Sequence, residues 1–146
     1  MSSKFHLVVL VIAAVFCGAY SETGGFREFS RYYHNYFRSK LGSSPLRLSS
    51  ELNIIAHSHA EKLAAENTFE SSNNGFGENL WAYRGPLRTL KVDCRDAINN
   101  WYTGSTVPGN AVSQVNRDVL LSNTTRAFGI GVGTANDYTV VVANYN

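Results

Sequence analysis

The segment FGIGVG at residues 128–133 alternates large apolar side chains with glycine, and this alternation decides the fold class. A strand shows this pattern when another element lies closely over the face from which side chains are missing. Asn136-Asp137 then supplies turn chemistry, and residues 138–145 form a run rich in β-branched and aromatic side chains. We therefore predict an antiparallel hairpin with a helix or an aromatic ring packed against its glycine face.

The part of the chain that precedes this hairpin has the period of a helix. Apolar side chains recur every three or four residues, which predicts helices over about 26–41, 50–66 and 92–102. Gly42 follows the first of these stretches and would end that helix. Helices that pack on an antiparallel sheet make an α+β fold.

The first residues have the pattern of a secretory signal peptide. Lys4 supplies a positive charge, residues 7–16 are an unbroken apolar run, and the small residues Gly18 and Ala19 follow. The apolar run is too short to cross a bilayer, which needs about 20 residues. We expect cleavage near Ala19, with Ser21 as the alternative. The product would be a secreted, extracellular protein without a membrane span, with residues 20–146 as one domain.

The charge balance excludes one class of partner. The chain has 13 Lys and Arg against 11 Asp and Glu, and removal of Lys4 with the leader would leave 12 against 11. The secreted protein would therefore be nearly neutral, and no basic run stands out in its sequence. Binding to nucleic acid depends on neutralising phosphates with clustered basic side chains. We expect no nucleic-acid partner.

Cysteine usage is unusual for an exported protein. The chain has two cysteines, and loss of Cys17 with the leader would leave Cys94 alone, so no intramolecular disulfide could form. A free cysteine is most often a buried, inert thiol, and a Cys94-linked dimer is the alternative. Asn123-Thr124-Thr125 is an N-glycosylation sequon just before the strand-like run, where a surface turn is expected.

Five motifs follow one another across nearly the whole chain after the leader. They are His34-Asn35-Tyr36-Phe37-Arg38; Pro45-Leu46 with Leu52, Ala56, Ala60 and Leu63; Gly77-Glu78-Asn79-Leu80; Trp101-Tyr102; and the strand-like segments 128–131 and 141–145. The series resembles the CAP superfamily, which comprises the cysteine-rich secretory, antigen 5 and pathogenesis-related proteins. The resemblance implies a three-layer α-β-α sandwich with a central antiparallel sheet and a cleft.

The resemblance also implies a metal site that this sequence has lost. In many members of the superfamily the cleft carries two His and two Glu, a ligand set that suits zinc. The corresponding positions here are Ser71, Glu78, Gly104 and Asn116, and no histidine follows His59. A single carboxylate leaves a metal ion mostly hydrated. We predict no metal and no other cofactor at the cleft.

Four polar residues remain as candidates for the cleft or its support. Glu78 and Asn79 belong to the Gly-Glu-Asn-Leu motif, and a carboxylate there is expected to fix its loop by hydrogen bonds. His34 and Arg38 lie one helical turn apart in the first motif, and the resemblance implies that they pack and form hydrogen bonds. No catalytic residue is assigned.

These observations favour a secreted, non-catalytic binding protein. The resemblance implies sterol or other lipid binding in an apolar groove, and two aromatic segments could contribute: Tyr32, Tyr33, Tyr36 and Phe37 on the first helix, and an aromatic loop with Trp81, Tyr83, Pro86 and Leu87. The alternative is an extracellular protein-interaction factor of defence, venom, saliva or reproduction that acts on a receptor or another organism. A hydrolase is least expected, because the Gly-x-Ser-x-Gly elbow is missing.

Overall fold

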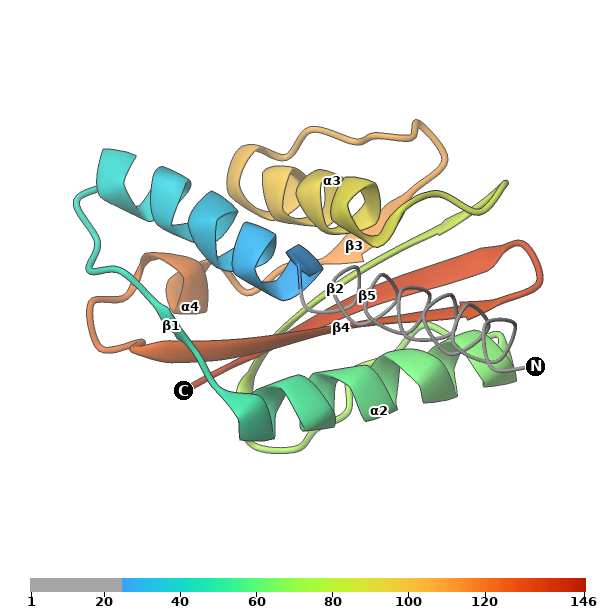
Figure 1. The fold of residues 1–146 in the computed structure, drawn as a ribbon, viewed down its shortest axis with the longest axis horizontal. Helices are drawn as coiled ribbons and strands as arrows, with labels where there is room; N and C mark the ends of the chain where they lie inside the picture. The colour runs from blue at the N-terminus through green and yellow to red at the C-terminus, as the bar shows by residue number, and fades with distance from the viewer. Residues whose placement is uncertain (1–24) are drawn as a thin grey trace, which may run out of the picture.

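The protein folds into three layers. The structure is a computed structural model that describes residues 25–146, so the expected leader and its cleavage near Ala19 lie outside the described residues. An N-terminal helix (residues 25–40) and α3 (Leu90–Thr103) cover one face of the sheet, and α2 (Ser50–Glu66) covers the other (Figure 1). The α-β-α sandwich and the α+β class expected from the sequence are confirmed.

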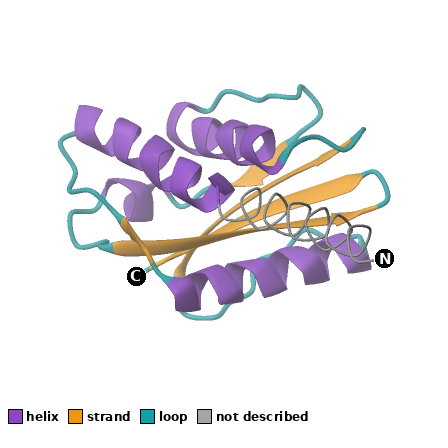
Figure 2. Ribbon diagram, viewed as in Figure 1, coloured by secondary structure: helices purple, strands orange, loops and turns teal. Residues whose placement is uncertain are grey.

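The middle layer is the sheet, drawn in orange in Figure 2. It has five strands in the order β1-β4-β5-β2-β3. Its strands are β1 (Arg47–Leu48), β2 (Gly77–Arg84), β3 (Val112–Gln114), β4 (Ala127–Ala135) and β5 (Tyr138–Tyr145). The ladders between β4, β5, β2 and β3 are antiparallel, as expected, whereas the short β1 runs parallel to β4.

The hairpin of β4 and β5 places its glycine face against α2, as the alternation predicted. A two-residue turn joins the strands, and Asn136 takes a left-handed conformation there with φ 56°. A Cβ atom on Gly131 would lie 2.2 Å from Cα of His57, and Gly129 and Gly133 approach the α2 backbone as closely. Only glycine lets a helix backbone lie this near to a strand.

The second helix is built for this close approach. Ser49 caps its start, because the Ser49 hydroxyl accepts a hydrogen bond from the backbone N–H of Leu52. The helix ends at Asn67, which is left-handed. Its buried face has mostly small side chains: Leu52, Ala56, Ala60, Leu63 and Ala64. Among residues 25–146, none of the helices is long and apolar enough to cross a membrane.

One expectation about the middle of the chain is wrong. Trp81 and Tyr83 do not belong to an aromatic loop; they lie inside β2 and are 0% and 3% exposed. Because the middle of β2 is covered on both faces, its side chains from Leu80 to Tyr83 are apolar without the alternation that identifies a half-exposed strand. Trp81 packs in the layer beneath α3, while its neighbours Leu80 and Ala82 pack beneath α2. The short helix α4 (Arg117–Leu121) was not expected either.

Candidate functional site

Glu78, at the start of β2, is held by four hydrogen bonds. The Ser71 hydroxyl and the Ser72 backbone N–H donate to its Oε1, each at 2.9 Å. The Ser72 hydroxyl donates to Oε2 at 2.5 Å, and the amide of Asn144 on β5 donates to the same oxygen at 3.2 Å. The carboxylate thereby fixes the loop that precedes β2 to the centre of the sheet.

The hydrogen bonds also set the charge of Glu78. Burial opposes ionisation, but the donors on Ser72, Ser71 and Asn144 outweigh it and hold the pKa of Glu78 below its ordinary value. Glu78 is therefore an anion at neutral pH. Both of its carboxylate oxygens already accept hydrogen bonds from the protein, so the role of this group is to hold the loop in place.

The structure brings three of the four positions that correspond to metal ligands toward one end of β2. Ser71 contacts Glu78, and the backbone N–H of Asn116 donates to the side chain of the adjacent Asn79 at 2.5 Å. Gly104 ends α3 in a left-handed conformation and offers no side-chain ligand. Within residues 25–146, no group of three or more His, Cys, Asp or Glu side chains is placed to hold a metal ion. The absence of a metal stays a prediction.

His34 lies in the core, where its ring joins the N-terminal helix to the sheet. It is 0% exposed, and its two nitrogens contact the hydroxyls of Tyr102 at 3.0 Å and Tyr145 at 3.3 Å. Burial and, as a smaller effect, the positive charge of Arg38 lower the pKa of His34 to about 3. The imidazole is therefore neutral and closed to solvent.

Arg38 is fully buried, and four backbone oxygens accept hydrogen bonds from its guanidinium. Its guanidinium donates to carbonyls that follow the N-terminal helix and that surround the end of α4: Ser44 at 2.6 Å, Leu120 at 2.5 Å, Ser122 at 2.9 Å and Thr125 at 3.5 Å. Carbonyls at the end of a helix carry partial negative charge, which compensates the buried cation. The residue ties together segments from both ends of the chain.

Cys94 lies on the inner face of α3 and is 0% exposed. Burial raises the pKa of its thiol to about 12, so almost no thiolate forms at neutral pH. A disulfide to a second chain requires an accessible sulfur. The Cys94-linked dimer, offered above as an alternative, is therefore incompatible with this fold.

Asn123, the expected glycan acceptor, lies on the surface in the connection between α4 and β4. Its side-chain oxygen accepts a hydrogen bond from the backbone N–H of Ser44 at 2.9 Å. A glycan attaches to the other atom of the amide, the nitrogen. The geometry accommodates a glycan, and its presence stays a prediction.

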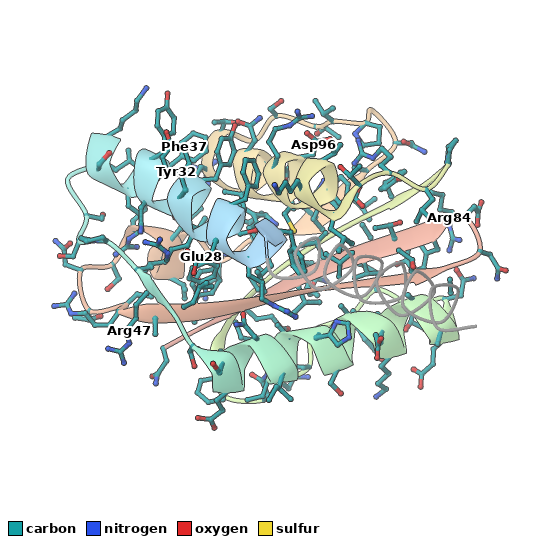
Figure 3. The ribbon with its side chains drawn as sticks, viewed as in Figure 1. Glu28, Tyr32, Phe37, Arg47, Arg84 and Asp96 are labelled. Atoms are coloured by element: carbon teal, nitrogen blue, oxygen red, sulfur yellow. The ribbon has the colours of Figure 1, made fainter. Side chains whose placement is uncertain are left out.

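A row of aromatic rings links the N-terminal helix to α3, and we call Phe29, Tyr33, Phe37 and Tyr102 the aromatic row. Phe29 and Tyr33 stack at 5.7 Å, Tyr33 and Phe37 meet edge to face at 5.3 Å, and Phe37 stacks on Tyr102 at 4.8 Å. All four are partly exposed, and Figure 3 labels Phe37 on the N-terminal helix. Sequence periodicity indicated the helical members, but not the contact with Tyr102.

Two shallow hollows lie apart from the aromatic row. The first, of about 420 Å³, is lined by Arg27, Ser50, Asn53, Ile54, His57, Ser58 and Glu61. The second, of about 380 Å³, is lined by Asn67, Thr68, Phe69, Ala82, Tyr83, Arg84, Asn110, Val112 and Tyr138. They are the competing places for a small ligand.

The fold, together with the motifs that Glu78, His34 and Arg38 represent, defines a class of protein. The model of the CAP family, described as the cysteine-rich secretory protein family, matches residues 31–145. The chain belongs to the CAP family. None of the curated proteins is similar enough in sequence to match it.

Solved structures share the fold at low sequence identity. The hookworm platelet inhibitor has a TM-score of 0.58 and 18% identity, over 82% of this chain and 68% of that chain. Na-ASP-1 has a TM-score of 0.61 and 18% identity over 83% of this chain, which spans only 38% of that protein. NaASP2 with Zn2+ has a TM-score of 0.63 and 16% identity, over 82% and 78%. At these identities the likeness concerns the fold alone.

Proposed function

We propose that the protein is a secreted, non-catalytic binding protein that takes a sterol or another lipid along the aromatic row. The observation that carries the proposal is that the ring of Phe37 contacts those of Tyr33 and Tyr102 and that all three rings remain partly exposed. Aromatic side chains give a large apolar contact area at low entropic cost, and tyrosine adds a polar hydroxyl. Such a surface suits a flat or elongated apolar ligand.

The end of the N-terminal helix adds a charge to this surface. Tyr36 is 42% exposed and stacks on Tyr33 at 6.2 Å, and the ammonium of Lys40 lies 4.4 Å from the centre of the Tyr36 ring. A fatty acid has an apolar chain and a carboxylate. Its chain would lie along the aromatic row and its carboxylate would reach Lys40.

The surroundings of the polar residues favour binding over catalysis. His34 is sealed in the core, and Ser71 donates to Glu78 instead of to a base. An activated nucleophile needs a general base within hydrogen-bond distance. Among residues 25–146, no hydrogen bond joins a serine or cysteine to a histidine, since the surface histidines His57 and His59 contact Glu61 and the carbonyl of Glu70.

The test is binding of labelled cholesterol and labelled palmitate to the purified secreted protein, with and without EDTA. We expect saturable binding that EDTA does not change. A Tyr33→Ser/Tyr36→Ser variant should bind at least fivefold more weakly, because it removes ring contacts on the helix surface. Ile54→Ser is the matched control: Ile54 is 71% exposed on α2 and lines the first hollow.

Three outcomes would contradict the proposal. Absence of saturable binding would exclude these lipids as ligands and favour an extracellular protein partner. A loss of binding in Ile54→Ser alone would move the ligand to the hollow beside α2. Binding that requires a metal would contradict the metal-free site.

A further inference from the structure

The outer edge of the sheet beside β3 is open. Among residues 25–146, β3 pairs only with β2, and its three residues Val112, Ser113 and Gln114 are all exposed. The α2 helix packs on β4 and β5, so it does not overhang this edge. An open strand edge presents unpaired N–H and C=O groups that can bind another strand.

The hydrogen-bonding groups that face outward can be derived from the ladder. In antiparallel sheets, hydrogen-bonded and non-bonded residue pairs alternate along the strands. The two residues that flank a two-residue turn form a hydrogen-bonded pair. Counting from that turn at Asn136-Asp137 through β5 and β2 makes Ala82↔Val112 and Leu80↔Gln114 the bonded pairs. The N–H and C=O of Ser113 therefore point away from β2, toward solvent.

This edge lacks the charges with which proteins usually keep strands apart. Residues 97–116 contain no Asp, Glu, Lys, Arg or His. Edge strands are commonly protected by charged side chains, lysine above all. Instead, Val107, Val112 and Val115 are 45%, 53% and 38% exposed along this stretch.

Part of the opposite edge of the sheet is closed. The carbonyl of Phe128 on β4 accepts a hydrogen bond from the Ser49 N–H at 2.9 Å. Two side chains bind the backbone groups of Ile130 on β4: Asn53 accepts a hydrogen bond from its N–H at 3.0 Å, and Arg27 donates one to its carbonyl at 3.1 Å. The outward-facing backbone groups of Phe128 and Ile130 thus have partners, whereas among residues 25–146 no hydrogen bond reaches those of Ser113.

We propose that the β3 edge pairs with the β3 edge of a second copy of this chain. The strands run antiparallel about a two-fold axis at Ser113, so the two Ser113 residues exchange N–H···O=C bonds and Val112 faces Gln114 of the second copy. In such a pair the residue at the axis meets its own symmetry mate, so any charge there would oppose a like charge. An uncharged strand avoids that repulsion, which is why a second copy fits this edge.

The association is weak and closed. A stable dimer buries about 1,200 Å² or more, and three strand residues with the flanking valines give a smaller contact. Dimerisation therefore appears at high micromolar concentration. Because the contact is the same patch on both copies, it stops at two chains and forms no fibre. Cys94, buried in the core, takes no part, so reducing agents leave the dimer intact.

The test is sedimentation velocity of the secreted protein from 10 µM to 1 mM, with and without reductant. We expect a shift from monomer to dimer over this range. Ser113→Lys and Ser113→Asp should each weaken the dimer at least tenfold, because like charges meet at the axis. A 1:1 mixture of the two variants should dimerise as well as the original protein, which also shows that both variants are folded.

The matched controls are Ser58→Lys and Ser58→Asp, on the exposed face of α2, which should dimerise unchanged. A protein that stays monomeric up to 1 mM would overturn the proposal. Dimers that persist in Ser113→Lys, or a mixture that fails to recover association, would equally overturn the pairing about Ser113.

Discussion

At the scale of single residues, His34 couples stability to pH. Its pKa is about 3 in the folded protein, where it is buried, against an ordinary value of 6.5 in the unfolded chain. Between these values the unfolded chain binds a proton that the folded protein does not. Stability therefore falls as the pH falls through this window, by at most about 1.4 kcal/mol per pH unit.

Asp93 acts in the opposite direction. Burial raises the pKa of Asp93 to about 6, against the lowering effect of Arg88, whose guanidinium lies 2.8 Å from the carboxylate. Between about pH 6 and the ordinary pKa of 3.8, Asp93 is therefore protonated in the folded protein and ionised in the unfolded chain. Between pH 6 and 4 the contributions of these two residues to stability therefore oppose each other.

The contribution of His34 is measurable as a difference. We expect the stability of His34→Gln, relative to the original protein, to rise by about 2 kcal/mol between pH 7 and pH 5, because glutamine binds no proton in the unfolded chain. Urea unfolding at both pH values measures this. An unchanged stability difference between His34→Gln and the original protein at the two pH values would refute the role of burial.

At the scale of elements, the contact between α2 and β4 is the tightest in the fold. In Gly131→Ala the new Cβ atom would lie 2.2 Å from Cα of His57, so one backbone must move. We expect a loss of about 3 kcal/mol or more in the free energy of unfolding. The control is Gly109→Ala, where nothing lies within 4 Å of the new atom and the change should stay within about 0.5 kcal/mol. A loss below about 1 kcal/mol in Gly131→Ala would show that the helix yields.

The same contact shows why part of the fold could be predicted from the sequence. Glycine alternation identified β4 and its covering helix, because the signal is local and has a fixed period. The residues of β2 gave no such signal, since both of their faces are buried, and β3 and α4 are too short to show a period. The Glu78 loop followed from a motif, whereas the contact of Phe37 with Tyr102 depends on how two separate helices pack.

At the scale of the whole molecule, Arg38 joins the N-terminal helix to the segment that leads into β4. Arg38→Met would leave buried carbonyls, including those of Leu120 and Ser122, without their donor. We expect a loss of at least about 2 kcal/mol in the free energy of unfolding. Thermal and urea unfolding measure it, with the exposed Arg47→Met as the control. Equal stability of the two variants would show that water replaces the guanidinium.

The single thiol of the described residues has a consequence for how this protein is made. With Cys94 sealed inside and no second cysteine between residues 25 and 146, the folded part holds no disulfide to form, shuffle or reduce. Its folding is therefore independent of the redox potential of the compartment, unlike that of small exported domains that depend on oxidation. The same fold should arise in a reducing cytosol and in an oxidising secretory lumen, with no need of an oxidase or an isomerase.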